Sequence, residues 1–206
     1  YSARVPVRTS IFFETIVTKR CKYKRIVERT MYKILLTGLG SIGKRHLRLL
    51  REHDDQVEIH AYRSSGIDDT AFPTVIQHTS LDDALAVNPD VAFITNPTSL
   101  HTDTAIACPE PGCHLFIEKP LSHPLDGVDE LTHTVAEHNL ITYVACVLRF
   151  HPVLRRLASL LDAAVIGNVY SYRVYSGSYL PAWRPDQDYR TSYSADPEMG
   201  GGVVMD

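Results

Sequence analysis

The chain has 206 residues, of which 44% are hydrophobic and 22% are charged, and its formal net charge at pH 7 is −3. This composition is that of a globular protein with room for one large or two small domains, and no apolar run approaches the length that crosses a membrane. The cysteines are scattered without a C-x-x-C pair. We therefore expect reduced core cysteines in a cytoplasmic protein and no disulfide framework.

Residues 1–30 carry eight Lys or Arg and two Glu, a net charge of +6 that leaves −9 for the rest of the chain. A basic, acid-poor stretch can be a nucleic-acid arm or a transit peptide. Met31, however, stands immediately before the first expected strand, at the place of a natural start. We therefore expect residues 1–30 to be a leader with little structure or of non-native origin, and we expect no nucleic-acid partner.

From Tyr32 to about residue 150, short apolar runs alternate with amphipathic stretches. The expected strands are 32–37, 57–62, 91–95, 115–117 and 141–147, and the expected helices are 41–53, 81–87, 99–108 and 126–138. Alternating elements of this length predict an α/β fold, a Rossmann-type parallel sheet with helices on both faces. We assign residues 31–150 to this dinucleotide-binding domain.

The pattern changes after Pro152. A short helix is expected over 153–161, and the alternating, aromatic-rich run 168–175 predicts a strand of a different, antiparallel sheet. A single strand cannot bury a sheet face by itself. Residues 151–206 are therefore expected to be the beginning of an incomplete α+β domain for substrate binding and oligomerisation.

A G-x-G-x-x-G motif connects the first expected strand to the first expected helix. Gly38 permits the tight turn, Gly40 lets the backbone approach a pyrophosphate, and Gly43 lets the helix pack closely on the strand. Together with Ser41 and Ile42 they would hold phosphates at the helix N-terminus, where unpaired N–H groups favour an anion. The alternatives are a simple glycine turn and the similar loop of S-adenosylmethionine enzymes.

The residue about twenty positions after the last glycine distinguishes NAD from NADP, because a carboxylate there binds the ribose 2′-hydroxyl and repels a 2′-phosphate. Arg63 stands at that place and Ser64 follows it, with no carboxylate at the strand end. A guanidinium and a hydroxyl suit a 2′-phosphate, so we expect NADP in preference to NAD. The alternative is a solvated arginine in a turn.

The chain resembles the Gfo/Idh/MocA family of NAD(P)-dependent sugar oxidoreductases over residues 32–206. The resemblance rests on G-L-G-S-I-G-K-R-H at 38–46, N-P-T-S-L-H at 96–101, E-K-P at 118–120 and G-G-G-V-V-M-D at 200–206. It implies that Lys119 touches the nicotinamide ribose and the substrate oxygen, and it adds Asn96, His101 and Glu118 to the cofactor site. Segment 96–101 departs from the family's T-P-N-x-x-H at Asn96 and Thr98. The family's role for the histidine can therefore be assigned to His101 with more support than the role of the residue at Thr98.

Lys119 can also be interpreted from its position alone. It follows a buried parallel strand, at the sheet edge where open α/β sheets bind ligands, and it can transfer a proton there. The alternative is a surface lysine.

The family's base lies in a D-x-x-x-H signature, of which Asp206 is the first residue. The resemblance implies that Asp206 orients the substrate hydroxyl, so the catalytic residues expected in this chain are Lys119 and Asp206. Since the histidine would come later, we expect these 206 residues alone to bind cofactor without turning over substrate.

The loop 179–190 looks like that of family members associated with surface-polysaccharide sugar metabolism. Aromatic rings stack on sugar faces, and arginines hold carboxylates or phosphates bidentately. The expected substrate-binding residues are Trp183, Arg184, Tyr189 and Arg190. A lid or a subunit contact is an equal alternative. No metal site is expected, because the His and Cys residues lack zinc-site spacing.

These observations predict an oxidoreductase that transfers a hydride between NAD(P) and a CH–OH group of a sugar or sugar derivative. The expected partners are a small sugar substrate and further copies of the chain. The alternative from another class is a non-catalytic NAD(P)-binding or sensing protein on the same fold. A methyltransferase is excluded by the E-K-P motif.

Overall fold

The computed structural model describes residues 31–68, 70–108, 112–123, 125–183, 185 and 188–202. The contacts within the chain divide these residues into two compact units, 31–146 with 173–202, and 147–172. The predicted leader at 1–30, Arg184 and Asp206 lie outside the described residues. No helix of the described part is long and apolar enough to cross a membrane.

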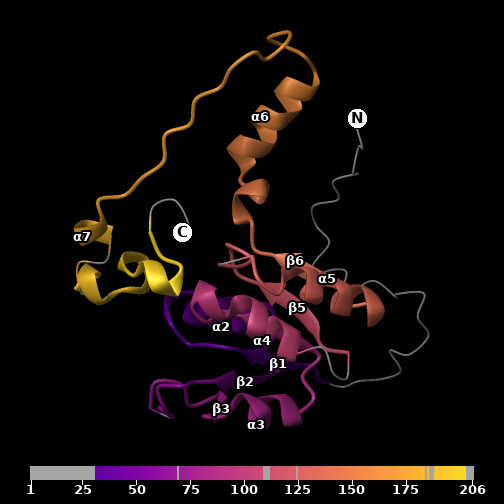
Figure 1. The fold of residues 1–206 in the computed structure, drawn as a ribbon, viewed down its shortest axis with the longest axis vertical. Helices are drawn as coiled ribbons and strands as arrows, with labels where there is room; N and C mark the ends of the chain where they lie inside the picture. Colours follow the sequence, from indigo (N-terminus) through magenta and orange to yellow (C-terminus); the bar gives the residue numbers. More distant parts are fainter. Residues whose placement is uncertain are drawn as a thin grey trace. The chain divides into compact units, whose positions relative to one another are not determined.

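A parallel sheet of six strands forms the larger unit, in the order β3-β2-β1-β4-β5-β6 (Figure 1). The strands are β1 (Lys33–Leu36), β2 (Glu58–Tyr62), β3 (Ile76–His78), β4 (Val91–Ile94), β5 (His114–Ile117) and β6 (Thr142–Val144). The helices between them are α2 (Ser41–His53), α3 (Leu81–Ala86), the 3-10 turn η1 (Thr98–Leu100), α4 (His101–Ala107) and α5 (Val128–Glu137). The predicted Rossmann-type sheet is thereby confirmed, because the strand order reverses direction at β1 and β4 as in a doubly wound fold.

The core has two layers because neighbouring residues of a strand point to opposite faces of the sheet. On one face, α3, α4 and α5 cover the apolar residues of β1, β4 and β5; the buried cluster comprises Leu35, Ala84, Ala92, Ile94, Ala105, Cys108, Cys113, Leu115, Ile117 and Leu131. On the other face, α2 places His46 against Phe93 and Phe116, with ring centroids 5.4 and 5.1 Å away. Helices thus cover both faces of the sheet.

The cysteines of this core agree with the prediction of reduced residues. Cys108 and Cys113 are free and buried, whereas Cys146 is free and exposed. Burial raises the pKa of Cys108 to about 12, because a thiolate would be poorly solvated there. Both buried thiols therefore act as small apolar core groups.

One strand of the sheet was not expected from the sequence. Strand β3 has three residues at the sheet edge, and Ile76 on it is exposed. The strand has one large apolar residue, Ile76, followed by Gln77 and His78. It is too short to show the alternation of apolar and polar residues that predicts a strand. Its pairing with β2 forms the strand.

The smaller unit contains a 3-10 turn, η2 (Val147–Phe150), and helix α6 (Pro152–Asp162), close to the expected helix. The predicted strand over 168–175 is wrong, because this stretch is irregular and every residue in it is exposed. A strand needs a hydrogen-bonded neighbour, and the described part of the chain offers it none.

The C-terminal part of the larger unit consists of short turns. These are α7 (Leu180–Trp183), η3 (Tyr189–Thr191), η4 (Tyr193–Ala195) and η5 (Pro197–Met199). The side chain of Asp188 caps η3 by accepting from the Arg190 N–H, and that of Asp196 caps η5 by accepting from the Glu198 N–H. These caps fix two of the turns locally.

Candidate active site

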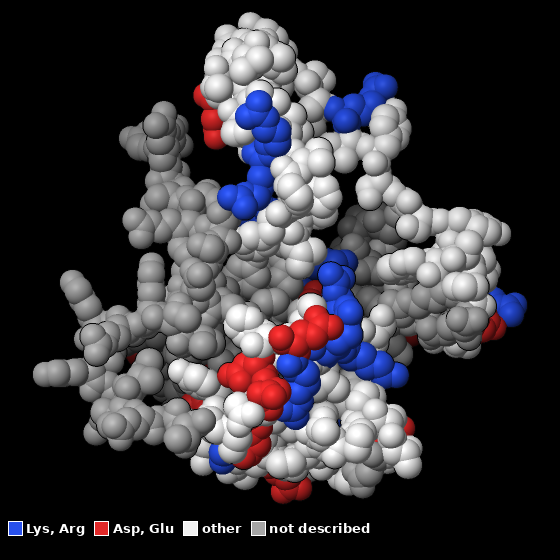
Figure 2. Space-filling model, turned by 180° about the vertical axis from the view of Figure 1, so that it is seen from behind, with Lys and Arg blue, Asp and Glu red and all other residues white. Residues whose placement is uncertain are grey.

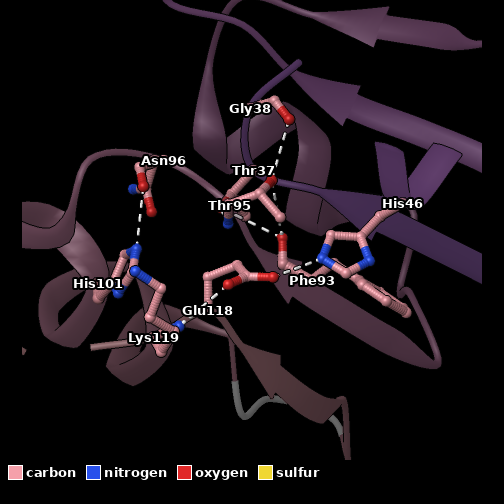
Figure 3. Close-up of polar contacts among 9 residues, drawn as sticks. All are labelled: Thr37, Gly38, His46, Phe93, Thr95, Asn96, His101, Glu118 and Lys119. Atoms are coloured by element: carbon pink, nitrogen blue, oxygen red, sulfur yellow. Dashed lines mark hydrogen bonds and ion pairs between the residues drawn. The ribbon is translucent and has the colours of Figure 1, made fainter. Parts of the chain in front are cut away.

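The glycine loop is bound to the end of the neighbouring strand β4 (Figure 3). The hydroxyl of Thr95 donates to the carbonyl oxygen of Gly38 at 2.9 Å, and the backbone N–H of Thr95 donates to the hydroxyl of Thr37 at 3.1 Å. A Cβ on Gly38 would lie 3.1 Å from the Thr95 carbonyl oxygen. The loop therefore has a fixed conformation that depends on glycine.

The N-terminus of α2 fits a pyrophosphate group. Gly40 is its N-cap, no side chain caps the helix, and its first turn holds no acidic residue. A Cβ built on Gly40 meets no atom within 4 Å. The first N–H groups of the helix have no intrahelical partner, so they and the positive end of the dipole can receive an anion beside Ser41 and Ile42.

Two cationic side chains lie against the ring of Phe72, Arg63 from the end of β2 and Lys44 from α2. The guanidinium of Arg63 lies 5.2 Å and the ammonium of Lys44 lies 5.6 Å from the centroid of the Phe72 ring. Arg63 also donates to the side-chain oxygen of Gln77 at 2.9 Å, while Ser64 is exposed. Arg63, the predicted discriminating residue, thus contacts the same aromatic ring as Lys44, a residue with no role predicted from the sequence.

Figure 2 shows basic and acidic side chains intermixed on one side of the molecule. On α2, Arg48 and Glu52 form an exposed i,i+4 pair at 3.6 Å. Such a surface pair adds little stability. On the face that Figure 2 shows, the central group of basic side chains lies directly beside acidic ones.

The segment after β4 is held by two side chains. Asn96 donates to the hydroxyl of Thr104 at 2.8 Å. His101 is 2% exposed. Its Nε2 atom lies 2.9 Å from the carbonyl oxygen of Asn96, and its Nδ1 atom lies 2.9 Å from the carbonyl oxygen of Pro120. Burial lowers the pKa of His101, and the two carbonyl groups oppose this effect. His101 therefore joins the loops that follow β4 and β5.

Glu118 and Lys119 follow β5 directly. Glu118 is buried, and its two carboxylate oxygens accept separate hydrogen bonds, one from Nε2 of His46 at 2.6 Å and one from the backbone N–H of Lys119 at 3.1 Å (Figure 3). The side chain of Lys119 is exposed, and the Lys119–Pro120 peptide bond is cis. His46 belongs to the glycine motif at 38–46, but nothing in the sequence indicated its contact with Glu118.

The segment 188–202 lies against the same edge of the sheet. The hydroxyls of Tyr193 and Thr98 are in hydrogen-bond contact, and Tyr193 also donates to the Gly200 carbonyl at 3.1 Å. Gly200 has a φ of +84°, and a Cβ on it would lie 2.9 Å from Thr98 and 3.3 Å from His123. Tyr193 and Thr98 were missed because the sequence gives no signal that pairs residues so far apart.

Three of the predicted sugar-binding residues, Trp183, Tyr189 and Arg190, are described, and they are exposed on the C-terminal turns. Trp183 is 48% and Tyr189 is 37% exposed. Arg190 forms a two-pronged contact with Asp188, at 3.0 and 2.9 Å, which lowers the pKa of that carboxyl. Arg190 is therefore already engaged by an internal carboxylate, while Trp183 and Tyr189 are partly exposed to solvent.

The glycine loop, Asn96 and Lys119 thus follow β1, β4 and β5, three neighbouring strands of one parallel sheet. In open α/β sheets, ligands bind beyond the carboxyl ends of strands where the strand order reverses. An anion-binding helix N-terminus and a lysine therefore share this edge, an arrangement that can bind a dinucleotide and transfer a proton.

A family model described as an oxidoreductase family with an NAD-binding Rossmann fold matches residues 32–146. The chain is 29% identical over 185 residues to the uncharacterized oxidoreductase YrbE of Bacillus subtilis, covering 85% of this chain and 51% of that protein. It is 25% identical over 182 residues to myo-inositol 2-dehydrogenase of Thermotoga maritima, and the match covers 84% of this chain and 51% of that protein. The chain therefore spans about half the length of these relatives.

Among solved structures, the WlbA dehydrogenase from Chromobacterium violaceum in complex with NADH and UDP-GlcNAcA is similar. The TM-score is 0.61 at 26% identity, over 70% of this chain and 43% of that one. The same type of sheet thus occurs in a dehydrogenase that binds a dinucleotide and a nucleotide sugar.

Proposed function

The chain belongs to the Gfo/Idh/MocA family of oxidoreductases with an NAD-binding Rossmann fold, and we propose that the whole protein transfers a hydride between NAD(P) and a CH–OH group of a sugar, cyclitol or sugar derivative. The observation that carries this proposal is the position of Lys119. It follows β5, which pairs with β4, and β4 in turn pairs with β1, the strand that leads into the glycine loop, so all three strands end at the same edge of the sheet. The myo-inositol and UDP-sugar dehydrogenases among the similar proteins support this substrate class.

The residues of this chain have separable roles in the proposal. The loop Gly38–Gly43, which includes Ser41 and Ile42, binds the pyrophosphate. Asn96, His101 and Glu118 hold the neighbouring loops in place. When bound, the nicotinamide ring accepts or gives the hydride. Lys119 hydrogen-bonds the substrate oxygen and moves its proton, and Asp206 orients the same hydroxyl.

The substrate contacts belong to the C-terminal turns in this proposal. The exposed rings of Trp183 and Tyr189 stack on a sugar face, and Arg184 meets an anionic substituent together with Arg190, for which the substituent competes with Asp188. An anionic sugar of the kind found in polysaccharide synthesis would use all four residues. We also propose that the whole protein is a homo-oligomer, which light scattering would measure.

The test is an assay of the whole protein with NAD⁺ or NADP⁺ and two alcohols, myo-inositol and UDP-GlcNAcA. Reduced cofactor should form with at least one of them. Tight cofactor binding without turnover of either alcohol, or of further sugars and cyclitols, would instead support the non-catalytic alternative.

We propose NADP as the preferred cofactor, because Arg63 follows β2 at the position that discriminates the ribose 2′-substituent and lies on the same Phe72 ring as Lys44. Arg63→Ala should weaken NADPH binding about 10- to 100-fold, the usual effect of losing a hydrogen bond between charged groups. NADH binding should change less than about threefold, since NADH lacks the 2′-phosphate. Fluorescence titration of both cofactors measures this.

Arg48→Ala is the matched control, because Arg48 is an exposed arginine on α2 whose partner is Glu52. It should leave both affinities unchanged. Equal or tighter binding of NADH by the unaltered protein, insensitive to Arg63→Ala, would contradict the NADP preference.

A further inference from the structure

We propose that His46 is a positioning residue for Lys119 and acts through the carboxylate of Glu118. The inference rests on the proposed function in one respect, the role of Lys119 in proton transfer. It assigns to α2 a second task, beyond holding phosphates at its N-terminus.

The first step is the geometry of the Glu118 carboxylate. Its side chain is 10% exposed, and that of His46 is 11% exposed, so water is largely excluded from the pair. Oε1 accepts from Nε2 of His46 at 2.6 Å, and Oε2 accepts from the backbone N–H of Lys119 at 3.1 Å. Because a carboxylate only accepts, Nε2 of His46 carries the proton in this contact. The orientation of Glu118, and with it the Lys119 backbone, therefore depends on the imidazole.

The second step is the rigidity of the imidazole itself. The ring lies 5.4 Å from Phe93 and 5.1 Å from Phe116, which stack on each other at 4.7 Å. These rings belong to β4 and β5, so they fix the ring over the centre of the sheet. His46 therefore holds Glu118 from a packed position rather than from a mobile surface.

The third step connects the two ends of the site. His46 lies on α2, shortly after Gly43 and the first turn that faces the phosphates. A helix of this length moves as a rigid element, so one element fixes both the phosphate-binding N–H groups and the anchor of Lys119. The contact thereby connects the helix that would hold the dinucleotide phosphates to the backbone of the lysine.

The test compares His46→Gln with His46→Met in the whole protein. Both side chains are unbranched and similar in length, but only glutamine has an N–H that can reach Glu118. His46→Met should lower kcat about 10- to 100-fold with KM for the alcohol changed less than about threefold, as expected for a displaced reacting group. His46→Gln should restore kcat to within about fivefold of the unaltered protein, because it keeps the donor.

A second readout needs no substrate. Hydrogen exchange of the Lys119 amide, followed by mass spectrometry on short peptides, should be about tenfold faster in His46→Met and near normal in His46→Gln, because that amide loses its oriented acceptor. In a Glu118→Leu background the two variants should no longer differ, because the partner that distinguishes them is gone. His133→Phe is the matched control, since it removes an exposed His–Glu contact on α5.

Each failure has a distinct outcome. If the unaltered protein oxidises no sugar or cyclitol, the proposed function fails, and amide exchange still decides whether His46 holds Lys119. Equal kcat and equal hydrogen exchange of the Lys119 amide in His46→Gln and His46→Met would overturn the inference. This holds if both variants match the unaltered protein, and it also holds if both lose structure together.

Discussion

Replacing Lys119 by alanine should lower kcat of the whole protein by about 10²- to 10⁴-fold, the contribution that general acid–base catalysis usually makes. The lysine is exposed at the carboxyl end of β5. Cofactor affinity should stay within about tenfold, because in the proposed function α2 binds the phosphates, and α2 follows β1, which β4 separates from the strand that precedes Lys119. Steady-state kinetics and cofactor titration measure the two effects separately.

Lys119→Arg is the informative companion variant. Arginine keeps the positive charge but does not give up a proton in proteins. If Lys119 moves the proton, Lys119→Arg should be nearly as inactive as Lys119→Ala. Activity of Lys119→Arg close to normal would show that only charge is needed, and turnover that survives Lys119→Ala would refute the role itself.

The sequence predicted the Rossmann half of the fold because its signals are local. Helix α2 begins and ends at the expected residues, Ser41 and His53, since the glycine loop precedes it and its apolar residues recur at helical spacing. The glycines, Arg63 and Lys119 were found in the same way, from motifs that each occupy one short segment. Local patterns therefore identified the ends of β1, β2 and β5 as parts of the candidate site.

Contacts between distant segments could not be predicted. The bond from His46 to Glu118 spans 72 residues, and that from Thr98 to Tyr193 spans 95. Neither pair has a spacing that a local pattern can reveal. The segment 168–175 shows the opposite error, because its alternation satisfies the strand pattern while its surroundings provide no partner strand. Tertiary context decides both cases.

Gly43→Ala should abolish cofactor binding and destabilise the domain. A Cβ at this position would lie 1.9 Å from the carbonyl oxygen of Gly38, a backbone atom that also accepts the hydroxyl of Thr95. No side-chain rotation relieves such a clash, so the loop or the start of α2 must move. Overpacking of this kind costs about 3 kcal/mol, which should lower Tm by roughly 6–12 °C in a domain of this size.

Gly40→Ala separates the effect on the fold from the effect on the cofactor. Its Cβ would meet no protein atom within 4 Å, and Gly40 has a φ of −68°, so the fold should tolerate alanine. Thermal unfolding should therefore match the unaltered chain, whereas NAD(P)H affinity should fall at least about tenfold if the pyrophosphate lies against this backbone. For Gly43→Ala we expect both quantities to fall. Normal Tm and normal cofactor affinity in Gly43→Ala would contradict this expectation. They would show that the glycine loop before the N-terminus of α2 has a conformation other than the one described.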